Sequence, residues 1–262
     1  MSAPVNRQDR HPALARLRSR EPVFGVMQII PAPTLSELAV WSGYDFVILD
    51  CEHGIVDEPA QLACLQVISG TDAFAAVRVK VGDLRAVSRY LDFGADAILM
   101  PDVRSRADAA VFVAAATRGP QGTRSSTGVA RVMRYGLGCP NGGSSPLLLA
   151  LIEGRHAVTH VAEIAATPGL DGLIIGPNDL SADLGCPNDF SAAAYIAAFT
   201  EIEQAARCAG VLLGSKPHPG FSAQRLVSAG HSLIIASADV AAVRDGYRSH
   251  LAAARGIAPA GD

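Results

Sequence analysis

The feature of the sequence that most restricts its fold is a series of eight short, nearly uninterrupted apolar segments. Strands of a parallel sheet have this composition, because both of their faces are buried. Ala- and Leu-rich helical stretches separate the segments, and several of these stretches end in Gly, a common helix C-cap residue: Gly43, Gly94, Gly210 and Gly230. The predicted strands are residues 23–30, 45–52, 73–80, 97–103, 147–153, 172–177, 211–216 and 232–239.

Eight strands that alternate with helices predict a (β/α)8 TIM barrel, an α/β domain that typically takes about 250 residues. The competing fold is an open, doubly wound sheet, which in its dinucleotide-binding form carries G-x-G-x-x-G after the first strand. The sequence there reads QIIPAPTLSE, so that fingerprint is absent. We expect one barrel over residues 21–255, an N-terminal extension at 1–20 and a C-terminal tail at 256–262.

The composition argues against several classes of function. The formal net charge of −3 leaves no basic surplus for a nucleic-acid backbone. No apolar run reaches the 18 residues of a membrane span, and the polar N-terminus does not resemble a signal peptide. The five cysteines are odd in number and form no C-x-x-C, which favours a reducing compartment. We expect a cytoplasmic protein that binds neither nucleic acid nor membrane.

One connection is unusually long. Residues 117–146, between the fourth and fifth predicted strands, are rich in Gly, Ser and Arg. A loop of this length in a compact domain is usually functional or disordered. It either lies on the return path from helix to strand or folds over the mouth of the barrel.

Active sites of barrels form at the carboxyl ends of the strands, so polar residues there are candidate site residues. Glu153 follows the six apolar residues LLLALI, where a lone buried carboxylate is costly unless it binds a cation. Asp179 follows the next strand and could face Glu153, although an acid in that place is often only a helix N-cap. Two carboxylates without His or Cys beside them suit Mg²⁺ or Mn²⁺.

Three kinds of basic residue also lie at strand ends. His53 follows two acids, and Asp50 or another carboxylate could orient its imidazole; the alternative is a solvated loop histidine. Arg78 lies inside an apolar run and needs an anion, either a structural carboxylate or a substrate oxyanion. Lys80 and Lys216 are the only lysines of the chain, and a Schiff-base lysine of a metal-free aldolase would occupy such a position.

The sequence resembles the HpcH/HpaI aldolases, which include 4-hydroxy-2-oxoheptanedioate aldolase, from about residue 22 to about residue 248. The resemblance implies a metal-dependent class II pyruvate aldolase, a carbon–carbon lyase that acts on a 4-hydroxy-2-oxo acid through a metal-stabilised enolate. It also implies a homohexamer, a trimer of dimers, in which subunits exchange the last helix of the barrel. The matching segments are FVILDCEHG (46–54), AVRVKVGD (76–83), LDFGADAILMPDV (91–103), ALIEG (150–154) and GLDGLIIGPNDLSADLG (169–185).

The resemblance also implies roles for individual residues. Glu153 and Asp179 would hold the metal, Mg²⁺ or Mn²⁺ with Co²⁺ as an alternative. His53 would be the catalytic base, with Asp92 tuning its basicity and Asp50 nearby. Arg78 would stabilise the enolate transition state. The substrate, a 2-oxo acid with an aldehyde partner, would contact a group of residues at the turn after the sixth strand: Gly176, Pro177, Asn178 and Asp179.

Two positions depart from the family pattern. Leu151 stands where the family commonly has a Gln that touches the substrate, so this substrate-binding position is apolar here. In the family's P-x-G-x-R-G loop, residues 120–125, the last Gly is Ser125. These changes leave three alternatives open: an altered aldolase, an oxaloacetate decarboxylase or citrate-lyase-like acyl-CoA lyase, and a non-catalytic barrel that binds 2-oxo acids.

Overall fold

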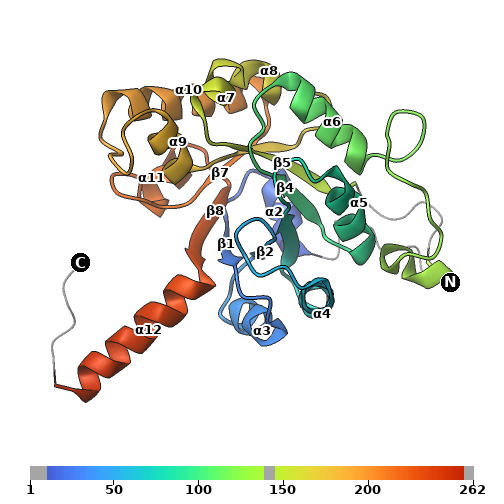
Figure 1. The fold of residues 1–262 in the computed structure, drawn as a ribbon, viewed down its shortest axis with the longest axis horizontal. Coiled ribbons are helices and arrows are strands. Elements are labelled where there is room, and N and C mark those ends of the chain that lie inside the picture. The colour runs from blue at the N-terminus through green and yellow to red at the C-terminus, as the bar shows by residue number, and fades with distance from the viewer. Residues whose placement is uncertain (1–10, 139–144, 257–262) are drawn as a thin grey trace.

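A computed structural model describes residues 11–138 and 145–256 and contains a closed barrel of parallel strands in sequential order (Figure 1). All eight predicted strands are confirmed, each within a few residues of its expected bounds. The strands are β1 (Val23–Gln28), β2 (Phe46–Asp50), β3 (Phe74–Arg78), β4 (Ala97–Met100), β5 (Leu147–Ile152), β6 (Gly172–Ile175), β7 (Leu212–Ser215) and β8 (Leu233–Ala238).

Helices on the outside connect successive strands and bury the outer face of the barrel. Side chains cap several of them, as when Asp83 accepts a hydrogen bond of 3.0 Å from the Ala86 N–H. Gly94 and Gly210 end their helices with left-handed φ angles of 105° and 68°, as predicted. The helices are α2 (Pro12–Arg18), α3 (Pro33–Trp41), α4 (Glu58–Ile68), α5 (Leu84–Phe93), α6 (Arg106–Ala116), η1 (Arg131–Gly136), α7 (Arg155–Thr159), α8 (Val161–Ala165), α9 (Pro177–Asp183), α10 (Ala193–Ala209), α11 (Ala223–Ser228) and α12 (Asp239–Ala254).

The interior of the barrel is a packed apolar core. Alternate residues of each strand point inward, so that on β5 Leu149 and Leu151 join the interior cluster while Leu148 and Ala150 face the helices. Burying these side chains contributes roughly 1.5–3 kcal/mol for each large aliphatic residue. The interior therefore offers no channel, and ligands can bind only at the ends of the barrel.

Helix α2 covers the amino-terminal end of the strands, called the lower end from here on. Its buried residues Ala13, Leu14 and Leu17 belong to the same cluster as the interior residues Val23 and Phe46. This helix lies within residues 1–20, the predicted N-terminal extension, and it packs against the interior of the barrel.

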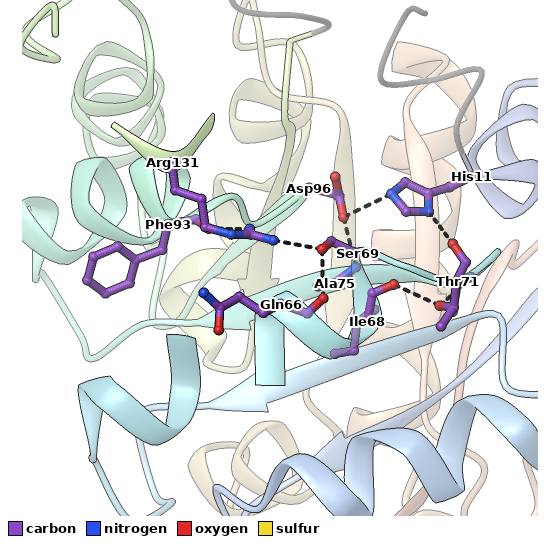
Figure 2. Close-up of polar contacts among 10 residues, drawn as sticks. His11, Gln66, Ile68, Ser69, Thr71, Ala75, Phe93, Asp96 and Arg131 are labelled. Carbon is purple, nitrogen blue, oxygen red and sulfur yellow. Dashed lines mark hydrogen bonds and ion pairs between the residues drawn. The ribbon is translucent and has the colours of Figure 1, made fainter. Parts of the chain in front are cut away.

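The long connection between β4 and β5 lies on the return path at the lower end. Arg131 of η1 donates hydrogen bonds of 2.7 Å to the Phe93 carbonyl and to the Ser69 hydroxyl, both at the ends of helices that return from the mouth (Figure 2). Nearby, buried His11 binds the Thr71 carbonyl at 3.2 Å. Of the two predicted positions for this connection, the return path is thus the one observed for residues 117–138. Residues 139–144, with Cys139, lie outside the described residues.

Helix α12 projects away from the barrel (Figure 1). It is anchored at its first residue, where the buried Asp239 carboxylate accepts hydrogen bonds of 3.0 and 2.9 Å from the Ile29 and Ile30 N–H groups. Farther along, Tyr247 and Leu251 are 75% and 51% exposed. Within the described ranges, no helix combines the length and apolarity required to cross a membrane.

Candidate active site at the carboxyl ends of the strands

The layer above the last apolar layer of the barrel is polar. On β5 the inward positions run Leu149, Leu151 and then Glu153, and on β3 the same alternation carries Arg78 inward. The register pairs Asp50 with Arg78 directly across β2 and β3. The strands therefore bring Asp50, Arg78 and Glu153 together at the mouth of the barrel, as predicted for strand-end residues.

Arg78 is held by two carboxylates. Its Nε and Nη2 donate hydrogen bonds of 2.8 and 2.7 Å to the two oxygens of Asp50, and Nη1 lies 3.1 Å from Oε2 of Glu52. Burial alone would raise the pKa of Asp50, but the hydrogen bonds and charge of Arg78 outweigh it and hold that pKa below its ordinary value. The guanidinium is thus fixed in place, with N–H groups left over for a ligand.

His53 lies next to Glu52 at the rim of the mouth. Its side chain is 68% exposed, and its Nε2 is 3.8 Å from Oε2 of Glu52. The Asp50 carboxylate instead contacts the backbone of this loop, accepting hydrogen bonds from the N–H groups of Glu52 at 3.0 Å and of His53 at 3.4 Å. The acid beside the imidazole is therefore Glu52, which the sequence analysis did not select. The sequence signal for Glu52 was its place directly before His53 in D-C-E-H. Because β2 ends at Asp50, the alternation of inward and outward side chains no longer applies beyond it.

The structure does not bring Asp92 to His53. Helix α5 runs from the mouth back to the lower end, so Asp92 in its last turn lies at the opposite end of the barrel. Its carboxylate accepts hydrogen bonds from Arg118 and Arg124, at 3.1 and 2.5 Å. Within a single chain, Asp92 fastens the long connection to α5, and the predicted tuning of His53 has no support.

Glu153 is a partly buried carboxyl with unusual surroundings. Burial raises its pKa to about 7, and the charges of Glu52, Asp179 and Asp102 add to the shift. One hydrogen bond opposes it, donated to Oε1 by the Asp102 N–H at 2.7 Å. Asp102 makes this bond with a φ of 53°, a left-handed conformation that is uncommon for a residue other than Gly.

Asp179 is the third residue of α9, not its N-cap. The N-cap position is Gly176, and no side chain caps this helix. The alternative that Asp179 serves only as a cap is therefore wrong, and its charge acts on both Glu153 and Glu52. Pro177 is buried at the start of the helix, while Asn178 and Asp179 are exposed at the mouth.

Gly176 leaves room for the Glu153 side chain. A Cβ at this position would lie 3.0 Å from Cβ and 3.1 Å from Oε2 of Glu153, both closer than ordinary contacts. Leu151 lies one layer below and is buried, so it forms an apolar floor under the carboxylates.

The acids at the mouth suit a divalent cation. Burial and the charge of Asp179 raise the pKa of both Glu52 and Glu153, and a hard cation bound by carboxylate oxygens would relieve that repulsion. Across residues 11–138 and 145–256, no group of three His, Cys, Asp or Glu side chains is close enough to enclose a metal ion. Two carboxylates such as Glu153 and Asp179 could hold an ion only with water or substrate at its other positions.

A cavity of about 260 Å³ lies elsewhere, at the lower end between α2 and the starts of the strands. Leu14, Arg18, Asp96 and Asp171 are among its lining residues. Asp171 already accepts a hydrogen bond of 2.7 Å from the Leu148 N–H. We take the mouth as the candidate site, because the charges of Glu52, Glu153 and Asp179 act on one another there beside Arg78.

Comparison with known proteins identifies the family. The model of the HpcH/HpaI aldolase/citrate lyase family matches residues 30–240. The chain belongs to this family. It is 31% identical over 254 residues to a pyruvate aldolase of Rhizobium etli, a match that covers 94% of this chain and 96% of the relative. It is 32% identical over 205 residues to a hydroxypyruvate/pyruvate aldolase of Sagittula stellata, covering 76% of this chain and 81% of the relative.

A solved structure supports the same assignment. The crystal structure of an HpcH/HpaI aldolase/citrate lyase family protein from Burkholderia cenocepacia J2315 superposes with a TM-score of 0.84 at 29% identity, covering 92% of this chain and 98% of that one. Family membership and the barrel predicted from the sequence are thus confirmed. Of the two departures from the HpcH/HpaI pattern, Leu151 lies under the mouth. Ser125 follows Arg124, which binds Asp92 at the lower end.

Proposed function

We propose that the chain is a metal-dependent aldolase that makes or breaks the C–C bond between a pyruvate-like 2-oxo acid and an aldehyde. The observation that carries the proposal is the position of Glu153 and Asp179 at the mouth, where the charge of Asp179 acts on Glu153 and the charge of Glu153 acts on Arg78. The two relatives named as pyruvate aldolases support the same reaction class.

Glu153 and Asp179 would hold the ion, Mg²⁺, Mn²⁺ or Co²⁺. When bound, such an ion supplies a Lewis acid that draws electron density from a keto oxygen. The raised pKa of Glu153 fits this role, because a carboxyl destabilised by burial and by neighbouring acids gains most from a cation.

His53 would exchange the proton at the carbon next to the keto group. It is exposed enough to pass that proton to water, and the Glu52 carboxylate lies 3.8 Å from its Nε2. In the cleavage direction His53 would take the proton of the hydroxyl group instead. The Asn178 side chain and the turn at Gly176 and Pro177 would position the substrate.

Arg78 would stabilise negative charge that develops on the substrate oxygen. Asp50 and Glu52 hold its guanidinium before any ligand arrives, so little reorganisation is needed at the moment of reaction. Leu151 offers no hydrogen bond, so the polar groups that recognise the 2-oxo acid must come from the layer above it.

A chelation and reconstitution assay tests the proposal. Protein stripped with EDTA would be assayed with pyruvate and a panel of small aldehydes, before and after addition of Mg²⁺, Mn²⁺ or Co²⁺, with C–C bond formation followed by NMR. We expect product only with metal. Activity unaffected by EDTA contradicts the metal site. Consumption of oxaloacetate without any aldehyde product favours a decarboxylase, and metal-dependent binding of pyruvate without turnover favours a non-catalytic barrel.

We also propose that the protein is a homo-oligomer, a hexamer in which subunits exchange α12. The support is the projection of this helix and the exposure of Val240, Tyr247 and Leu251 on it. The double substitution Tyr247→Glu and Leu251→Glu should lower the mass measured by light scattering, whereas Val111→Glu on α6 should not. An unchanged mass in the double variant contradicts the exchange.

A further inference from the structure

Lys216 points into the mouth of the barrel from β7. Along this strand Leu212 faces the interior and Leu213 faces the helices, so Gly214 and then Lys216 occupy the inward positions. Ser215 faces the other way, and its hydroxyl donates to the Ile175 carbonyl at 3.4 Å. Because the register pairs Ile175 with Ser215, Lys216 lies beside Gly176, which separates it from Glu153.

The surroundings of Lys216 leave its ammonium group available to a ligand. The side chain is half-buried, and the charges of Asp179 and Arg78 both act on it. In the part of the chain that the structure describes, its Nζ makes no hydrogen bond or ion pair, whereas Arg78 is held by two acids. A half-buried cation without a partner, next to the proposed metal ligands, is suited to bind an anionic substrate group.

The backbone of Lys216 is held rigidly. Its carbonyl accepts a hydrogen bond of 2.8 Å from Nδ1 of His218, whose Nε2 accepts one of 2.8 Å from the Tyr195 hydroxyl. The His218 ring also stacks on Phe221, with 4.6 Å between the ring centroids. With the backbone held, the ammonium moves only by rotation about the side-chain bonds of Lys216, which lowers the entropy lost when it binds a ligand.

Lys80 provides a natural contrast. It comes two residues after Arg78 and is exposed, in a turn where the Asp83 N–H donates to its carbonyl at 3.0 Å. The two lysines of the chain thus share a sequence context at strand ends, but only Lys216 lies at the carboxylate cluster.

We propose that Lys216 binds a carboxylate of the substrate and thereby determines the preference of the site for anionic reactants. The carboxylate belongs either to the 2-oxo acid donor or to a carboxylated aldehyde acceptor. This proposal rests on the proposed aldolase function, and it replaces the Schiff-base role that the sequence left open for this lysine. The apolar side chain of Leu151 cannot bind a carboxylate. On the β7 side of the mouth, Lys216 is therefore the residue that recognises negative charge.

The test compares Lys216→Met with Lys80→Met and Lys216→Arg in Mg²⁺-loaded protein. Kd for pyruvate is measured by calorimetry, and KM is measured for two two-carbon aldehydes, anionic glyoxylate and neutral glycolaldehyde. If Lys216 binds the donor, Lys216→Met raises the Kd for pyruvate about ten- to a hundredfold. If it binds the acceptor, only the KM for glyoxylate rises by that factor. In either case Lys216→Arg retains most of the affinity, and Lys80→Met resembles the parent protein.

Two results would overturn the proposal. Lys216→Met could leave both the Kd for pyruvate and the ratio of the two KM values unchanged. Alternatively, borohydride could trap pyruvate on Lys216 as a covalent adduct, which would make it a Schiff-base residue. If the parent protein binds pyruvate but catalyses no reaction, the proposed aldolase function is wrong. The comparison of Kd values for pyruvate still tests the role of Lys216 in that case.

Discussion

The two ends of the barrel use carboxylates in opposite ways. At the lower end, acids that immediately precede β2, β4 and β6 accept hydrogen bonds from the backbone of the preceding strand. The sheet supplies these donors, so each acid fastens two neighbouring strands together. The pairs are Asp45 with the Phe24 N–H at 2.9 Å, Asp96 with the Ala75 N–H at 3.0 Å and Asp171 with the Leu148 N–H at 2.7 Å.

At the mouth the carboxylates differ in their charged neighbours, not in the number of backbone donors. Glu153 accepts one amide hydrogen, from Asp102, and is otherwise surrounded by the acids Glu52 and Asp179. A carboxylate that joins two strands through backbone hydrogen bonds stabilises the fold. A carboxylate placed beside other carboxylates is repelled by them, and a bound cation would relieve that repulsion. Substitutions at the two ends should therefore separate stability from activity.

The largest expected effect is that of Glu153→Gln on turnover. Loss of one of two anionic metal ligands should lower metal-dependent kcat/KM about a thousandfold or more, because the stabilisation supplied by the ion is lost. The protein should still fold, since the lost group binds no strand. Kinetics with calorimetric Mg²⁺ titration measure both effects, and Glu201→Gln on α10 is the control. A variant that retains a tenth of the activity contradicts the assignment.

His53→Ala should lower kcat about a hundred- to a thousandfold, because the proton-transfer group is lost. Mg²⁺ affinity should stay the same, because His53 is not among the proposed ligands. Stopped-flow kinetics and calorimetry measure the two effects, and His156→Ala, on the exposed surface of α7, is the control. An equal loss of metal affinity would show that His53 holds the ion.

The pKa of Glu153 predicts an effect of pH on the stability of the metal-free protein. Its folded-state pKa of about 7 lies above the ordinary 4.5, so the folded state keeps a proton that the unfolded state releases between these values. The stabilising contribution is therefore complete below pH 4.5 and is lost as the pH rises through 7. The loss is up to about 3 kcal/mol. Urea unfolding in EDTA should show it as a free energy of unfolding that falls with rising pH in the parent protein but not in Glu153→Gln, so that the difference between the two widens. A constant difference would contradict it.

The smallest effect belongs to the lower end. Asp171→Ala leaves the Leu148 N–H without its acceptor and should lower the free energy of unfolding by about 1–3 kcal/mol. The kcat of the folded protein should not change. Urea unfolding measures the first quantity, with exposed Asp72→Ala as the control. A loss of kcat at unchanged stability would mean that the two ends are coupled.

Local patterns in the sequence were enough to predict the strands and several residues of the mouth. Glu153 and Arg78 were found because burial follows from the apolar residues before them, and a buried charge needs a partner. Asp92 shows the limit of such reasoning. Its partners Arg118 and Arg124 belong to a distant connection, and only the tertiary structure shows that α5 carries Asp92 away from His53.

Other features had no local signal at all. The sequence assigned α2 to an extension, because no pattern in the polar N-terminus predicts that Leu14 and Leu17 pack against the lower end of the barrel. The contact from the Asp102 N–H to Glu153 depends on a left-handed backbone at a residue that is not Gly, which no sequence pattern indicates.

The closure of the lower end by α2 has a consequence for the order of events in turnover. With one end covered and the interior filled, the mouth is the one end of the barrel left for reactants. Under the proposed aldolase function, the reactant nearest the Leu151 floor would bind first, and a second reactant above it would block its escape. The products would then leave in the reverse order of binding.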